Sequence, residues 1–398
     1  MRVLIADDSA SLPSTIQEMF QRAPAGKSAG GELAAQIEAV LVTRGVGAPA
    51  AAKATSVRAP SDDCGPRPTL PPCGLCDLND QPELHATVLE AIGIALLNRG
   101  CIDAGSKFVL AARDIRLEHF GKNHPYTAAS YNSYSRVLRI RDELIEAEKE
   151  VGKAIVINRK VYGSGGLPLV ANLNELGAVR LYQGDFRGAL KVAESGLKIL
   201  KKRGVYKEDP NTSRLLDVQG RALEGLGKLA PALRALNAAL KLDEKQVGSD
   251  HPKYATHRAN LATVQWAQGN LSDARAGFEL AVAVYEKVLS RPGHPNLIDV
   301  YANLGSVLIK LGDLPLAKDY LCKALGLNEQ LRGAGHTLVG NDHANLGRYY
   351  LANGNKPAAL EQFIKALGIY KENVKRKRLP RKHPYIMEAE VWIERSKC

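Results

Sequence analysis

The chain of 398 residues is long enough for two or three domains of roughly 150 residues each. It carries 54 Lys and Arg against 42 Asp and Glu, a formal net charge of +12, and its 45% hydrophobic content excludes a fully disordered protein. No run of about 18 uncharged apolar residues occurs, so the sequence predicts no membrane span. Six cysteines are too few for a disulfide scaffold. Asp7 and Asp8 lie where a secretory signal peptide has its apolar region, so we expect a cytoplasmic protein.

The first 80 residues differ from the rest in composition. Ala, Gly, Pro and Ser dominate from about residue 23 to residue 72, which predicts a poorly ordered N-terminal segment and linker over residues 1–80. Cys64, Cys73, Cys76 and His85 offer three thiols and an imidazole to a zinc ion. Their spacing matches no zinc module, and His85 belongs to the helix that follows, so we expect no metal site.

From residue 81 to residue 398 the sequence repeats with a period of about 42 residues. Dipeptides mark the period at His124-Pro125, Leu167-Pro168, Asp209-Pro210, His251-Pro252, His294-Pro295, His336-Thr337 and His383-Pro384. Successive steps are 43, 42, 42, 43, 42 and 47 residues. Proline suits the first turn of a helix and disfavours helical geometry in the residue before it, so each pair predicts a helix start. Such regularity predicts an array in which each repeat packs on its neighbours.

Each repeat contains two amphipathic helices by this pattern. The first helix carries a small residue at a fixed place: Gly93, Ser135, Gly177, Gly220, Ala262, Gly305 and Gly347. Seven residues later the predicted turn has glycine in six repeats and Asp142 in the other. The second helix alternates small residues with a larger apolar one, as at Leu236, Phe278, Leu321 and Phe363. Small residues let helix axes approach closely, and the larger ones fill the grooves.

Residues 82–398 resemble the kinesin light chain type of tetratricopeptide domain. The resemblance rests on this spacing of small and large residues and on three Asn-Leu-Ala or Asn-Leu-Gly triplets, which begin at Asn260, Asn303 and Asn345. The resemblance implies an all-α, right-handed solenoid of about seven helix-turn-helix repeats, with a C-terminal capping helix at residues 384–397. It also implies a non-enzymatic scaffold or adaptor without a cofactor, which binds extended or helical peptides of partner proteins in the concave groove.

The candidate peptide-binding residues lie at equivalent places on the first helices. In the kinesin light chain family, asparagines placed like Asn260, Asn303 and Asn345 hydrogen-bond the peptide backbone, because an amide both donates and accepts. The same asparagines are also compatible with a simple solvent-facing helix surface. Basic side chains nearby would favour acidic peptides, and an indole offers a hydrophobic anchor. These further candidates are Arg221, Arg348, Lys310 and Trp266.

A basic run over residues 374–382 falls where the period grows from 42 to 47 residues. It contains Lys375, Arg376, Lys377 and Arg378. A solvated loop is the favoured interpretation, with a nuclear-import signal or a contact with an anionic surface as alternatives.

Two other functions stay open. A basic solenoid could bind nucleic acid, although the groove positions follow no ordered base-reading code, which disfavours nucleic acid as a partner. The array could instead be the detached sensor arm of a signalling ATPase. The sequence shows no catalytic constellation that would favour an enzyme.

Overall fold

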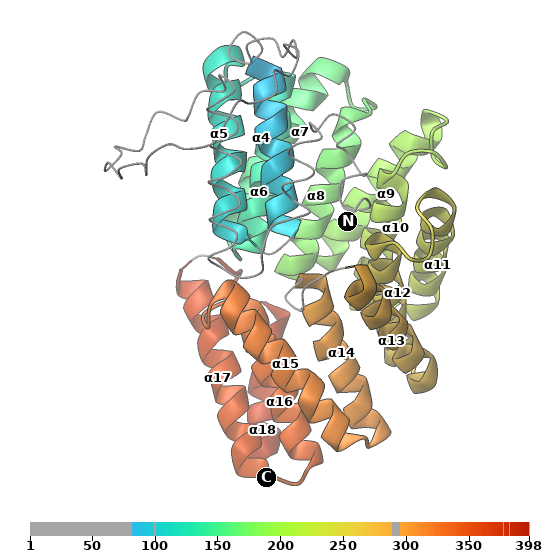
Figure 1. Ribbon diagram of the computed structural model, residues 1–398, viewed down its shortest axis with the longest axis vertical. Coiled ribbons are helices and arrows are strands. Elements are labelled where there is room, and N and C mark those ends of the chain that lie inside the picture. The colour runs from blue at the N-terminus through green and yellow to red at the C-terminus, as the bar shows by residue number, and fades with distance from the viewer. Residues whose placement is uncertain (1–81, 99–100, 289–294, 377, 382, 398) are drawn as a thin grey trace, which may run out of the picture.

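The computed structural model describes residues 82–98, 101–288, 295–376, 378–381 and 383–397. The predictions for residues 1–80, including the thiols of Cys64, Cys73 and Cys76, lie outside these ranges, as does Lys377. Within them the chain forms fifteen α-helices and no β-strand, which confirms the predicted all-α fold (Figure 1).

In chain order the helices are α4 (Pro82–Asn98), α5 (Ile102–Phe120), α6 (Pro125–Ile140), α7 (Leu144–Tyr162), α8 (Pro168–Gln183), α9 (Phe186–Lys202), α10 (Asn211–Gly225), α11 (Leu229–Gln246), α12 (Pro252–Ala267), α13 (Leu271–Val288), α14 (Pro295–Leu311), α15 (Leu314–Arg332), α16 (Thr337–Ala352), α17 (Lys356–Lys375) and α18 (Pro384–Lys397). Over the described part of the chain, every helix is too short or too polar to cross a membrane.

The helices pair as the 42-residue period predicts. Helix α4 packs on α5, α6 on α7 and so on to α16 on α17, and α18 packs on α17. We call the even-numbered helices the first helices of their repeats and their partners the second helices. First helices of neighbouring repeats also contact one another, as α8 and α10 do, whereas contacts of this kind are marginal between second helices. First helices therefore line the inner, concave side of a solenoid, and second helices form its outer side.

Small residues bring the two helices of a repeat together. A Cβ atom on Gly305 would lie 2.7 Å from Cγ of Leu321, and one on Gly347 would lie 2.6 Å from the ring of Phe363. Leu321 and Phe363, the larger apolar residues of the pattern, are fully buried. The predicted alternation of small and large residues is thus the packing register of the array.

The turns between paired helices use the left-handed backbone conformation. Gly184, Gly227, Gly269, Gly312 and Gly354 have φ between +72° and +86°. Asp142 adopts the same conformation, with φ of +66°, and is the one such residue other than glycine in the part of the chain described. A side chain with a Cβ atom is disfavoured there by roughly 1–2 kcal/mol.

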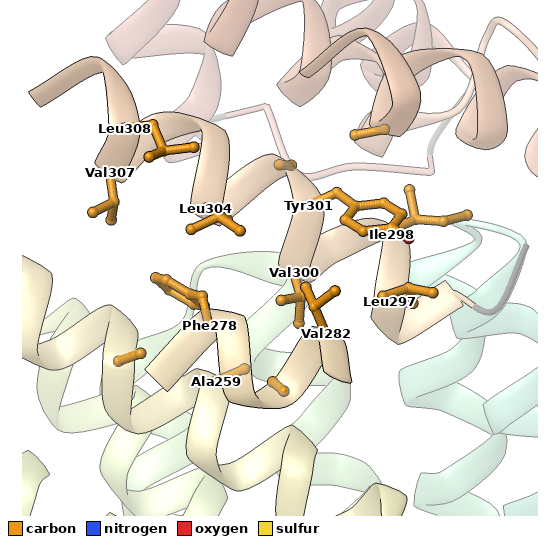
Figure 2. Close-up of a cluster of buried hydrophobic side chains, with 14 of the residues drawn as sticks. Ala259, Phe278, Val282, Leu297, Ile298, Val300, Tyr301, Leu304, Val307 and Leu308 are labelled. Carbon is orange, nitrogen blue, oxygen red and sulfur yellow. The ribbon is translucent and has the colours of Figure 1, made fainter. Parts of the chain in front are cut away.

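The hydrophobic core consists of clusters of buried side chains that lie between neighbouring helices. Its largest cluster runs from α12 to α16, where Phe278 and Val282 of α13 face Val300 and Leu304 of α14 (Figure 2). At the C-terminal end the indole of Trp392 stacks on Phe363 with 5.8 Å between ring centroids. Helix α18 therefore covers the last pair, which confirms the predicted capping helix.

Within the described residues, four histidines of the repeated dipeptides cap the starts of even-numbered helices. Each imidazole Nδ1 accepts a hydrogen bond from the backbone N–H two residues further on, which is otherwise unpaired at a helix start. These bonds measure 3.2 Å from Tyr126 to His124, 3.0 Å from Lys253 to His251, 3.2 Å from Leu338 to His336 and 3.3 Å from Tyr385 to His383. The predicted structural role of the dipeptides thus includes the histidine as well as the proline.

The solenoid turns back on itself, so that repeats far apart in sequence meet. In Figure 1, α6 and α8 lie above α16 and α18. We call this contact the seam. His336 Nε2 donates to the carbonyl of Ile140 at 3.1 Å, and His383 Nε2 donates to the carbonyl of Tyr182 at 2.9 Å. These are donors because Nδ1 of each ring already accepts a helix-capping bond.

The second half of the seam involves backbone and carboxylate groups. The N–H of Leu144 donates to the carbonyl of Arg378 at 3.2 Å. The backbone N–H of Thr337 donates to Oδ2 of Asp142 at 2.8 Å, and the Thr337 hydroxyl donates to the same oxygen. Asp142 and Thr337 are both buried. The seam closes the inner side of the array between its second and seventh repeats.

Candidate partner-binding surface on the inner face

A group of polar side chains lies on the inner side, next to the seam. They come from α8 and α10, the end of α6, and the starts of α14, α16 and α18. We call this group the inner cluster; its members are Arg139, Glu175, Tyr182, Asp217, Arg221, Asp299, Asn341 and Tyr385. The guanidinium groups of Arg139 and Arg221 lie 5.5 Å and 5.9 Å from the centre of the Tyr182 ring, so α6, α8 and α10 meet at this group. Burial raises the pKa of Asp299 and of Tyr385, and the charge of Arg221 acts against that rise, as expected for neighbouring groups on α14 and α18.

Arg139 and Glu175 form the tightest ion pair of the inner cluster. Arg139 Nε lies 2.8 Å from Glu175 Oε1 and its Nη2 lies 3.3 Å from Oε2, a two-pronged arrangement. Burial alone would lower the pKa of Arg139, but the Glu175 carboxylate holds it above its ordinary value. The guanidinium carbon also lies 5.5 Å from the centre of the Tyr182 ring. The donors of Arg139 are therefore largely occupied within the chain.

Arg221 is paired more loosely. Its Nη1 lies 4.0 Å from Oδ2 of Asp217, the limit of an ion pair, and its side chain is 37% exposed. Asp217 also accepts a hydrogen bond of 2.7 Å from the Asn260 amide. The Arg221 guanidinium lies 5.9 Å from the Tyr182 ring centre, a distance at which a cation is attracted to the ring face. Arg221 thus keeps donors available on the inner side.

The opposite wall of the inner cluster contains carboxylates and phenols. Burial raises the pKa of Asp299, although Arg332 and Arg221 lower it, and burial also raises the pKa of Tyr385. Asp342 lies next to them on α16, where Oδ2 accepts a hydrogen bond of 2.7 Å from Asn328. Burial raises the pKa of Asp342 to about 7. A protonated carboxylic acid near neutral pH can both donate and accept.

The three predicted asparagines occupy equivalent places but have different partners. Asn260 donates to Asp217, as described above, whereas the Asn345 Oδ1 accepts from Nη1 of Arg348 at 2.5 Å. Arg348 also pairs with Glu388 of the capping helix. Asn303 is half-buried and, among the residues described, has no side-chain hydrogen-bond partner. Of the three amides, Asn303 is therefore the freest to meet a ligand.

The remaining predicted residues are not gathered at one point. Trp266 is half-buried against the largest hydrophobic cluster, and Lys310 is exposed near the end of α14. The basic run is partly an element of the seam. Leu379 within it is 2% exposed, and the Arg378 carbonyl accepts the bond from Leu144, whereas Lys375 and Arg376 stay exposed.

Arg221 is the one member of the inner cluster that the sequence analysis predicted as a binding residue, and the other seven were not predicted. Arg139, Tyr182 and Tyr385 stand near helix ends, at places that do not correspond between repeats. Only the seam brings the start of α18 next to the end of α8. In the sequence, each of these three residues is only an Arg or a Tyr near a helix terminus, which is also compatible with an ordinary solvent-exposed surface.

These repeats and their concave inner side define a helical-repeat protein of the class that binds other proteins. Residues 214–287 and 291–372 match the family model of the tetratricopeptide repeat, so this part of the chain consists of tetratricopeptide repeats, as the 42-residue register predicts.

Solved structures share the fold at low sequence identity. A Rap protein complexed with Competence and Sporulation Factor is 12% identical, with a TM-score of 0.56 over 96% of this chain and 97% of its own. The apo form of RapI is 15% identical, with a TM-score of 0.52 over 73% of this chain and 99% of its own. A putative kinesin light chain of Podospora anserina with nearly identical TPR-like repeats is 19% identical, with a TM-score of 0.41 over 53% of this chain and 99% of its own.

Proposed function

We propose that the chain is a non-enzymatic scaffold whose inner face binds a peptide segment of a partner protein. The observation that carries the proposal is the loose pairing of Arg221, which is 37% exposed on the inner side and has its nearest carboxylate at 4.0 Å. An Arg with free donors beside aromatic rings suits a carboxylate of the ligand, since the planar guanidinium can hold both oxygens. We therefore propose an acidic peptide.

The amide of Asn303 supports a grip on the peptide backbone. It is half-buried on α14, across the inner side from α10, and the described residues leave its polar atoms unpaired. A Rap protein of similar fold has been solved in complex with Competence and Sporulation Factor, so that protein holds a second molecule. We extend that capacity to this chain, with an unidentified protein partner in the cytoplasm.

The experiment is affinity capture with the full chain as bait, followed by mapping of the bound segment of any captured protein. Arg221→Glu and Asn303→Ala should each weaken binding of the mapped peptide by at least tenfold, which corresponds to about 1.4 kcal/mol. Lys318→Glu, on the outer side of α15, makes the same charge change as Arg221→Glu and should leave the affinity unchanged. Equal affinities for all four proteins would reject the inner face as the binding surface.

Nucleic acid is the second candidate, because the net charge is +12. Seven Lys and Arg against one Glu lie between residues 371 and 382, so about half of that excess belongs to one short segment. Binding of single-stranded DNA measured against salt concentration separates the two functions, because phosphate contacts weaken steeply as salt rises. No association at low salt would exclude the nucleic-acid function.

A further inference from the structure

The outer side of the solenoid has one helix with an unusual charge. Helix α9 carries five Lys and Arg residues against a single Glu in 17 residues. The helices of the neighbouring outer positions are nearly balanced, with four basic and three acidic residues on α7 and three basic and two acidic residues on α11. The positive charge of α9 is therefore a local feature and not a consequence of the repeat pattern.

The basic residues of α9 form a stripe. The side chains of Arg187, Lys191, Lys198 and Lys202 are all exposed. The three lysines follow Arg187 by 4, 11 and 15 residues, which places all four side chains within about 60° of one another around the helix axis. Glu194 is the one acidic residue in the same stripe. An elongated ligand along α9 would therefore meet positive charge over the whole length of the helix.

A cleft opens beside the first half of this stripe. It has a volume of about 410 Å³ and lies between α9 and the turn that joins α10 to α11. Its lining residues are Arg187, Leu190, Lys191, Glu194, Leu226 and Lys228. Leu190 and Leu226 are half-buried, whereas the three basic residues are exposed. The cleft thus has apolar walls at its base and positive charge at its rim.

The basic residues at the rim differ from three exposed basic residues elsewhere on the outer side, which have a carboxylate within ion-pair distance. Lys149 pairs with Glu146 at 2.8 Å, Arg275 with Glu279 at 2.7 Å and Lys365 with Glu361 at 2.7 Å. In the part of the chain described, none of the side chains of Arg187, Lys191 and Lys228 has such a partner. Their charge is available to a ligand.

We propose that this cleft, together with the stripe of α9, is a second docking site, which binds an acidic peptide segment carrying one or two apolar side chains. The apolar side chains fill the space of about 410 Å³ against Leu190 and Leu226. The acidic side chains face Arg187, Lys191 and Lys228. Complementary charge of this kind chiefly sets specificity and the rate of association.

The shape of the cleft favours a peptide over other anions. A nucleic-acid backbone or a lipid headgroup would gain from the positive charge but would leave the leucine walls without a complementary surface. A peptide with alternating acidic and apolar residues satisfies both parts of the cleft. Since the site lies on a second helix, it is separate from the inner face, and the chain could hold two partners at once.

The test uses a fluorescein-labelled 16-residue peptide in which two leucines, one helical turn apart, are flanked by glutamates. Binding to the full chain is measured by fluorescence anisotropy at 50 mM and 300 mM salt. Lys191→Glu combined with Lys228→Glu should weaken binding at least tenfold, whereas Lys318→Glu combined with Lys323→Glu on α15, the same change of charge, should not. Arg221→Glu on the inner face should also leave this affinity unchanged, so the site is tested independently of the proposed function.

A copy of the peptide with serine for each leucine should bind at least fivefold more weakly, because the walls of the cleft are apolar. If the α15 control variant lost as much binding, the loss in Lys191→Glu combined with Lys228→Glu would come from the change in net charge alone, and the proposal would be overturned. Absence of binding by the leucine peptide would also overturn it, as would tighter binding of single-stranded DNA or phosphatidylserine vesicles through Lys191 and Lys228. Circular dichroism of each variant confirms that the helices are retained.

Discussion

Asp142 and Thr337, 195 residues apart, are hydrogen-bonded to each other by both the backbone N–H and the hydroxyl of the threonine. Each is a departure from the repeat pattern. Asp142 stands where the other described turns between paired helices have glycine, and Thr337 stands where most repeats have proline after the histidine. Proline has no N–H and glycine has no carboxylate, so the residues that the repeat pattern usually places here could not make the bond. The two exceptions in the sequence are thus the two halves of one contact across the seam.

Restoring the repeat pattern should therefore open the seam. Asp142→Gly removes the carboxylate but also relieves the left-handed backbone, and Thr337→Pro removes the donor. A lost hydrogen bond to a charged group costs about 1.5–3 kcal/mol, and relief of a positive φ returns about 1–2 kcal/mol, so thermal stability should change little in Asp142→Gly. In Asp142→Gly, the amide hydrogens of Thr337 and Leu144 should nevertheless exchange with solvent at least tenfold faster than in the parent protein.

Thr337→Val is the matched control, since it keeps the backbone N–H and loses only the hydroxyl. The seam amide of Leu144 should exchange more slowly in Thr337→Val than in Thr337→Pro. Small-angle scattering should show a larger radius of gyration for Asp142→Gly than for the parent protein. Unchanged exchange and unchanged dimensions would mean that the seam does not depend on this contact.

The seam should also respond to acid. His336 is buried and neutral, with Nδ1 accepting and Nε2 donating, and burial lowers its pKa to about 4. The unfolded chain binds this proton near pH 6.5, so stability is complete above that pH and falls as the pH drops from about 6.5 towards 4. Burial lowers the pKa of His383 in the same direction.

His336→Asn tests this expectation, because asparagine still caps the helix but does not titrate. Thermal melting at pH 7.5 and pH 5.0 should show a smaller difference between the two pH values in the variant than in the parent protein. A difference of the same size would assign the acid sensitivity to other groups.

Much of the fold could be predicted because tetratricopeptide packing is local. The small residues at Gly305 and Gly347 and the glycine turns repeat at fixed spacing, and each of the two small residues contacts a residue within its own repeat. The seam could not be predicted in this way. Whether repeat two meets repeat seven depends on small rotations that accumulate along the array, which no single repeat encodes. Apart from Arg221, the inner cluster was missed for the same reason, since Tyr182 and Tyr385 become neighbours only through the seam.

The small positions predict a sharp contrast between two glycines. A Cβ atom on Gly305 would lie 2.7 Å from Leu321 and 3.2 Å from the Ala317 carbonyl, so Gly305→Ala forces two helices apart. We expect a loss of about 1–3 kcal/mol in the free energy of unfolding. A Cβ atom on Gly326 of α15 would meet no neighbouring atom within 4 Å, and Gly326→Ala should add about 0.5–1 kcal/mol through helix propensity. Chemical denaturation measures both, and a loss in both variants would contradict the packing argument.

Asp342 predicts a pH dependence of the opposite sign to that of His336. Burial raises its pKa to about 7, against an ordinary value of 3.8, so the folded chain binds the proton more tightly than the unfolded chain. Its contribution to stability is fully present below about pH 4 and is lost as the pH rises towards 7 and above. Asp342→Asn keeps an acceptor for the Asn328 amide and removes the buried charge, so it should be more stable than the parent at pH 8, by on the order of 2 kcal/mol. The advantage should shrink as the pH falls to 5, because Asp342 is then protonated in the parent protein.

Denaturation midpoints at the two pH values give the result, and a variant that is less stable than the parent at pH 8 would show that the Asp342 carboxylate is stabilised as an anion.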